Sequence, residues 1–233
     1  LQGANSQSPN GGRLQTEPYA ANRRGGLASI INEVPPPRAN GDDPDSVTVD
    51  LQVQRVTVVA TRPRIMPPNT SLTANQGQFW IADADGTVEV YVELERELAP
   101  GFDVRTGQTI SFRATRVGRF GDKPQITAGN SWTLHDDVDA HATVSAREPN
   151  VPLSALNVPE IVRVTGLIDG QPIACGGMAQ CWSMSYSEGT ALLRTTVPNL
   201  RPQTCVTYVG PLSSFQGDIQ FDVVNDEWMT TYQ

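Results

Sequence analysis

Lysine is almost missing from this chain. The 233 residues include one Lys (Lys123), so Arg supplies nearly all of the positive charge. Charged residues make up 18%, against about 25% in ordinary globular proteins, and the net charge is -8. Nucleic-acid binding draws most of its affinity from cationic contacts to phosphate, and no run of Lys or Arg is present. On this ground we do not expect a nucleic acid as partner.

Long apolar stretches are also missing. No window approaches 18 consecutive apolar residues, so we expect no membrane-spanning helix. The chain begins at Leu1 without a charged-then-apolar leader. We interpret it as a mature chain whose targeting segment has been removed, or as a fragment, and we expect an extracytoplasmic location.

Cysteines are few and lie in the second half of the chain, at Cys175, Cys181 and Cys205. Cys175 and Cys181 flank a Gly-Gly pair, where a hairpin would bring them within bridging distance. A disulfide there is predicted and would fit an oxidising compartment. The alternative is three buried, reduced thiols.

What the chain does contain is a repeat. Thr109–Trp132 and Thr204–Trp228 match in spacing. The corresponding residues are Phe120 and Phe215, Gln125 and Gln220, and Asn130 and Asn225, and the closing Trp132 and Trp228 are displaced by one residue. A self-repeat of this length predicts two copies of one module. We expect its aromatic residues to pack in or at the ends of the modules rather than to serve as stacking platforms for sugars.

The strand pattern is that of short strands and tight turns. Apolar and polar residues alternate from Val47 to Val59, and Asp85-Gly86 between two alternating runs is a strong hairpin signal. The predicted fold class is all-β, with two tandem five-stranded OB-like Greek-key barrels and an extended N-terminal arm. The predicted boundaries are 1–46 for the arm, 47–135 for the first barrel, 136–159 for a linker and 160–233 for the second barrel.

The arm has the composition of a linker with one apolar island. Leu27, Ile30, Ile31 and Val34 are spaced for one face of a short helix that ends before three prolines, although the same residues would also suit a strand. We predict that this island is a docking element, and that it docks on another copy of the chain.

The run from Gly77 to Val92, GQFWIADADGTVEVYV, resembles the second and third strands of bacterial extracytoplasmic OB-fold domains. Val104–Ile110 resembles the start of the fourth strand of that family. The resemblance implies an OB fold. It leaves open whether the protein binds an oligonucleotide, a sugar, a metal or a protein, or is a scaffold. Glu89, Glu93 and Glu95 stand where nucleic-acid-binding members carry basic and aromatic residues.

Candidates for chemistry are sparse. His135–His141 (HDDVDAH) holds two His and three carboxylates, but an acidic linker explains it better than a metal site. Asp83-Ala84-Asp85-Gly86 fits a hairpin turn better than a calcium loop. Ser183 and Ser185 have no His nearby in the sequence, and Cys205 is expected to be buried and inert. We expect no enzyme activity, no cofactor and no bound metal.

These patterns favour a non-catalytic, exported structural protein. In this interpretation it is a subunit of an extracellular or cell-surface filament, held together by self-association through the arm. The alternative is a monomeric cell-surface OB-fold module that binds an oligosaccharide or a single-stranded nucleic acid.

Overall fold

A computed structural model was analysed, and its described residues divide into two compact units, the second of which begins at Ala146. The described residues are 24–36, 46–62, 76–93, 104–121, 123–135, 146, 148–175, 179–197, 199–215 and 217–232. Among them, no helix is long and apolar enough to cross a membrane.

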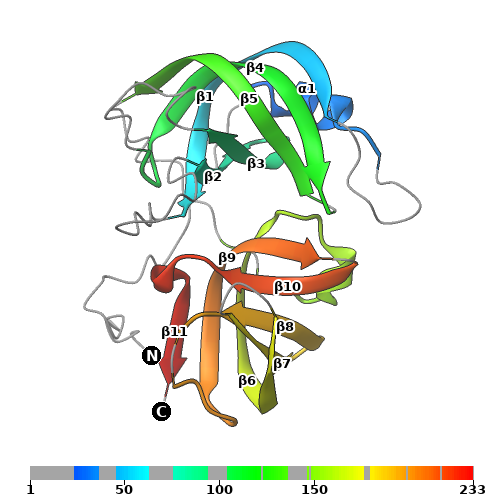
Figure 1. Ribbon diagram of the computed structural model, residues 1–233, viewed down its shortest axis with the longest axis vertical. Coiled ribbons are helices and arrows are strands. Elements are labelled where there is room, and N and C mark those ends of the chain that lie inside the picture. The colour runs from blue at the N-terminus through cyan, green and yellow to red at the C-terminus, as the bar shows by residue number, and fades with distance from the viewer. Residues whose placement is uncertain are drawn as a thin grey trace. The chain divides into compact units, whose positions relative to one another are not determined.

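The first unit contains a closed barrel of five strands, called barrel 1 (Figure 1). Its strands are β1 (Val47–Thr61), β2 (Gln76–Asp83), β3 (Gly86–Glu93), β4 (Thr109–Phe120) and β5 (Lys123–His135). Their order around the barrel is β1-β2-β3-β5-β4, and β4 pairs back on β1. Neighbours are antiparallel except β3 and β5, which are parallel. A closed Greek-key ring of five strands is the OB arrangement.

The second unit repeats this ring as barrel 2. Its strands are β6 (Ile161–Ala174), β7 (Gln180–Tyr186), β8 (Gly189–Thr195), β9 (Cys205–Phe215), β10 (Asp218–Val223) and β11 (Met229–Tyr232). β10 pairs with β8 in parallel and with β9 in antiparallel, which closes the ring β6-β7-β8-β10-β9. The predicted fold class, two tandem OB-like barrels, is confirmed. β11, which extends the sheet beside β9, was not predicted because four residues are too few to show alternation.

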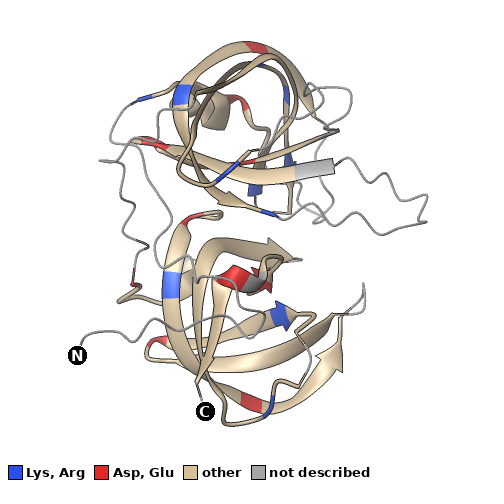
Figure 2. Cartoon of the chain, turned by 90° about the vertical axis from the view of Figure 1, so that its left-hand side faces the viewer, with Lys and Arg blue, Asp and Glu red and all other residues tan. Residues whose placement is uncertain are grey.

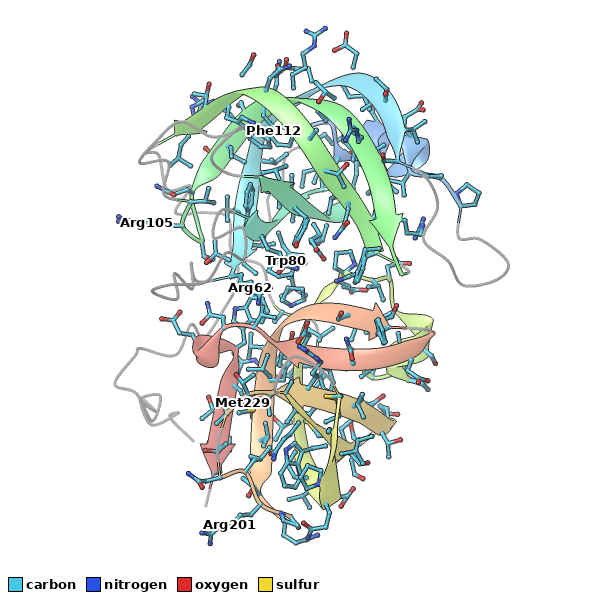
Figure 3. The ribbon with its side chains drawn as sticks, in the orientation of Figure 1. Arg62, Trp80, Arg105, Phe112, Arg201 and Met229 are labelled. Carbon is cyan, nitrogen blue, oxygen red and sulfur yellow. A yellow bond between two sulfur atoms is a disulfide. The ribbon has the colours of Figure 1, made fainter. Side chains whose placement is uncertain are left out.

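The core of barrel 1 is built from the inward-facing positions of the alternating strands. Phe112 on β4 stacks on Trp132 of β5, with ring centroids 4.2 Å apart. Figure 3 shows Phe112 within this barrel. Its neighbours are the buried apolar residues Val53, Val56, Val58, Phe79, Ile81, Val88, Val90, Val92, Ile110, Ala114, Val117 and Ile126.

The core of barrel 2 is organised around Tyr208 on β9. This fully buried ring packs on Phe221 and meets Trp228 edge-on, with centroid distances of 4.8 and 6.5 Å. Its hydroxyl donates to the carbonyl of Pro211 at 2.8 Å, and burial raises the pKa of Tyr208 well above its usual value. Gly210 leaves room for that hydroxyl, since a Cβ at this position would lie 2.8 Å from it.

The apolar island of the arm forms α1 (Leu27–Glu33), so the helical interpretation is confirmed. Leu27, Ile30 and Val34 are buried, and they belong to the same core cluster as the strands of barrel 1. The prediction that this island docks on another copy is therefore wrong. The apolar face of the helix packs in the core of barrel 1.

The start of α1 is fixed by the carboxylate of Asp83, the last residue of β2. One of its oxygens accepts the N–H groups of Gly25 and Leu27 at 2.7 and 3.1 Å, and the other accepts the N–H of Asp85 at 2.8 Å. Gly25 lies so close to β1 that a Cβ would be 2.3 Å from a methyl of Val56. Gly26 has a φ of 101°, which favours glycine. The two glycines therefore allow the arm to approach the strand.

Asp83→Ala should destabilise barrel 1 by about 3 kcal/mol, because it leaves buried N–H groups without their charged acceptor. Urea denaturation of the full chain measures this change. Asp85→Ala is the matched control. It removes an exposed carboxylate that pairs with the exposed Arg24, and should cost under about 0.5 kcal/mol. Equal losses for the two variants would contradict the role assigned to Asp83.

Candidate ligand-binding face

The strand registers show which residues of the two barrels correspond. In barrel 1, Trp80 pairs with Glu89, which pairs with Gln125. In barrel 2, Ser183 pairs with Leu192, which pairs with Gln220. Ser183 thus occupies the place of Trp80, and Leu192 that of Glu89. At the turn between the fourth and fifth strands, Asp218 occupies the place of Lys123. Both sets lie on the outer face of the second and third strands, the face that OB folds use for ligands.

In barrel 1 these positions carry large, buried side chains. Trp80 is 4% exposed and Glu89 is 1% exposed. The ammonium of Lys123 lies 3.0 Å from the carboxylate of Glu89, which also accepts the amide groups of Gln78 and Gln125 at 2.9 and 2.7 Å. An indole and an internally neutralised ion pair therefore occupy this part of barrel 1.

In barrel 2 the smaller side chains leave a hollow of about 540 Å³. One wall is the 3-10 turn η1 (Leu153–Ala155), which precedes the first strand of the barrel. The others are the β7–β8 hairpin from Tyr186 to Thr190, the start of β8, and the β9–β10 turn at Gly217 and Asp218. Among the described residues that line the hollow, none is Lys, Arg or His.

The chemistry of the hollow combines hydroxyls, carboxylates and an apolar surface. Ser183 and Thr190 contribute hydroxyls, and Glu188 and Asp218 contribute exposed carboxylates. Leu192 adds apolar surface. A few polar groups around an apolar surface are typical of small-molecule sites. This set offers strong acceptors and neutral donors to a ligand rich in hydroxyl groups.

Tyr186 holds one wall of the hollow in place. Its hydroxyl accepts the N–H of Leu153 at 3.1 Å, which attaches η1 to the β7–β8 hairpin. Tyr186 and Asp83 each end the second strand of their barrel, opposite Gly189 and Gly86 respectively. In both barrels, this position holds the segment that precedes the first strand.

The predicted disulfide joins Cys175 and Cys181, whose Cα atoms are 5.8 Å apart. It closes the connection between β6 and β7, two residues before Ser183. Cys205 is free and only partly buried, between Leu167 and Tyr232 in the strand register. We expected Cys205 to be buried, and the structure places it at intermediate exposure.

The predicted catalytic and metal candidates do not come together. Ser183 lines the hollow, whereas Ser185 donates its hydroxyl to Asp169. Of the segment 135–141 only His135 is described, and its Nε2 lies 2.8 Å from the hydroxyl of Ser111, a contact that sequence reasoning missed. Within the described ranges, no three His, Cys, Asp or Glu side chains form a group that could hold a metal ion. Asp83–Gly86 is the predicted hairpin turn.

The repeated aromatic residues differ in how far they are buried. Trp228 is buried, and Trp132 packs on Phe112 as predicted. Phe120 and Phe215, however, are 45% and 51% exposed at the ends of β4 and β9. Of the two predicted positions, core or barrel end, these phenylalanines take the barrel end, where about half of each ring is exposed.

No protein-family model and no curated protein matches the chain, but solved structures do. One is described as tetrameric p202 HIN2, at 12% identity and a TM-score of 0.40, covering 93% of this chain and 100% of the other. A second is a murine DNA-binding protein bound to double-stranded DNA, at 13% identity, a TM-score of 0.40 and coverages of 79% and 97%. A third is a replication protein A heterotrimer bound to single-stranded DNA, at 14% identity, a TM-score of 0.33 and coverages of 84% and 51%.

These likenesses concern the OB-like fold and not the bacterial extracytoplasmic family that the β2–β3 sequence resembles. Two of the three solved structures are described as bound to DNA, against our expectation that nucleic acid is not a partner. The expectation of a filament subunit joined through the arm is wrong, since the apolar residues of the arm pack in the core of their own barrel.

The disulfide predicts a simple pattern of alkylation. Unfolded in guanidinium without a reductant, the chain should take up iodoacetamide at Cys205 only, because the other two thiols are joined. With a reductant it should take up iodoacetamide at all three cysteines. Mass spectrometry of the intact chain distinguishes the two states, and triple labelling without reductant would contradict the assignment.

Proposed function

We propose that this chain is a non-catalytic, extracytoplasmic OB-fold binding protein, and that barrel 2 binds a segment of an oligosaccharide in its hollow. The observation that carries the proposal is the difference between the two copies. At corresponding positions, barrel 1 has Trp80 and the Lys123–Glu89 ion pair, whereas barrel 2 has Ser183, Leu192 and Asp218 around a hollow of about 540 Å³.

The ligand class follows from the groups that the hollow presents. Carboxylates such as Glu188 and Asp218 accept two hydroxyl hydrogen bonds each, and charge-assisted bonds are the strong ones. A phosphate would meet these carboxylates without a cation among the described lining residues. A neutral sugar fits the acceptors, the hydroxyls and the apolar surface together. The Cys175–Cys181 disulfide supports the extracytoplasmic location, since disulfides persist in oxidising compartments.

A second candidate function is the binding of a single-stranded nucleic acid by barrel 1. The observation that favours it is the grouping of Arg62 and Tyr91, since Trp80 on the same face is only 4% exposed. Arg62 is exposed, its guanidinium donates to Gln78 at 3.2 Å, and Gln78 pairs with Tyr91 across the sheet. Figure 3 labels Arg62 and Trp80 at the same end of barrel 1. Aromatic rings with an adjacent cation bind single strands by stacking and phosphate contact.

The distribution of charge makes this second candidate weaker than the first. Figure 2 shows the Lys and Arg positions of the described residues spread over the chain instead of following one stripe. Burial raises the pKa of Tyr91, an effect that Arg62 partly opposes. The ring therefore remains neutral at physiological pH and can stack, but a single exposed guanidinium supplies few phosphate contacts.

Ser183→Trp should abolish sugar binding by filling the hollow with the side chain that barrel 1 carries at Trp80. A glycan microarray of bacterial, fungal, plant and animal polysaccharides measures binding. Asp218→Asn changes an exposed carboxylate and should weaken binding severalfold without affecting folding.

The matched control for that experiment is Ser29→Trp, which places the same side chain on the exposed face of α1. It should bind like the wild type. A wild-type chain that binds no glycan on the array would overturn the proposed function. So would a Ser183→Trp variant that is folded and binds normally.

For the second candidate, Arg62→Gln should weaken the binding of oligo-dT and lower the slope of log affinity against log salt by about 0.7. Fluorescence anisotropy at several salt concentrations measures both. Arg116→Gln, which removes an exposed cation from β4, is the control and should change neither value. If the wild-type chain does not bind oligo-dT at low salt, this candidate is excluded.

A further inference from the structure

Phe215 and Phe120 are corresponding residues on the turns between the fourth and fifth strands. Each is the last residue of its strand, and each is about half exposed. A large apolar ring that is half exposed at a turn gains little from packing. Packing therefore does not explain why both barrels carry this ring, and in at least one of them it has another role.

In barrel 1 a cation covers the ring. The ammonium of Lys123, which faces Phe120 across the hairpin, lies 5.3 Å from the ring centroid. A cation over an aromatic face is attracted by the negative charge of the ring face. Lys123 also pairs with Glu89, so Phe120 is part of the network that occupies this face of barrel 1.

In barrel 2 the residue that faces Phe215 across the hairpin is Asp218. A carboxylate is repelled by the negative face of an aromatic ring, so Asp218 cannot take the role of Lys123. The ring of Phe215 is 51% exposed, and its face is available to a ligand.

Phe215 also adjoins the hollow. Directly paired residues on antiparallel strands place their side chains on the same face of the sheet. Asp218 lines the hollow, so Phe215, its partner, lies beside the hollow on the same face. An acceptor for hydroxyl groups and an apolar platform thus stand next to each other at the β9–β10 turn.

Resting on the proposed function, we infer that Phe215 is a second subsite and determines which sugars bind. The ligand is an oligosaccharide of at least two pyranose units, one in the hollow and the next stacked on Phe215. The axial C–H groups of a gluco-configured pyranose make its faces apolar, so that one face can pack on an aromatic side chain. The hydroxyls at the ring edge then point toward Asp218.

Phe215→Ala should weaken the binding of a tetrasaccharide about tenfold and leave the binding of its monosaccharide unchanged. The probes are cellotetraose, maltotetraose and chitotetraose, with glucose and N-acetylglucosamine as their single units. Calorimetry measures the tetrasaccharides, and NMR titration measures the monosaccharides. Because Phe215 is exposed, the variant should fold normally, and Phe120→Ala is the matched control in barrel 1.

The outcomes separate the inference from the proposed function. If Phe215→Ala binds the tetrasaccharide as tightly as the wild type while Ser183→Trp has lost it, the second subsite is wrong and the hollow remains the site. Equal weakening by Phe120→Ala also overturns the subsite. If the wild type binds none of these tetrasaccharides and no glycan on the array, the proposed function itself is wrong.

Discussion

A five-stranded ring covers its core on the sides but not at its end, and the rest of this molecule depends on how that end is covered. In barrel 1 the segment before the first strand does this: α1 and its C-cap residue supply the buried residues Leu27, Ile30 and Val34 to the core. In barrel 2 the corresponding segment, η1, forms a wall of the hollow. The last residue of the second strand holds each segment, through the carboxylate of Asp83 in barrel 1 and the hydroxyl of Tyr186 in barrel 2.

The duplication makes the two barrels informative about each other. They share strand order, the parallel pair and the attachment of the preceding segment, so residues can be matched through the register. The differences concentrate on the outer face of the second and third strands and on the adjoining turn. There, one copy has Trp80 and Lys123 where the other has Ser183 and Asp218. The candidate binding face of barrel 2 is therefore found by comparing it with the corresponding face of barrel 1, which large side chains fill.

The sequence predicted the strands because alternation and Asp-Gly turns are local signals, and it predicted the Cys175–Cys181 disulfide from a short spacing. It could not tell where α1 docks, since an amphipathic face fits its own barrel or another copy equally well. It did not show that Phe120 and Phe215 are about half exposed, because repetition of a residue does not distinguish packing from exposure. The sequence did not predict the hollow, because neither Ser183 nor Leu192 indicates a binding site by itself. Aligning Trp80 with Ser183 would have pointed to it.

Lys123 has a consequence for work with this protein. It is the only lysine in the sequence, it is 6% exposed, and Glu89 and the ring of Phe120 surround its ammonium. A buried, ion-paired amine is hard for a reagent to reach. Amine-reactive dyes, lysine-directed cross-linkers and lysine-modifying enzymes therefore find no accessible side chain, so immobilisation for binding measurements has to use another chemistry.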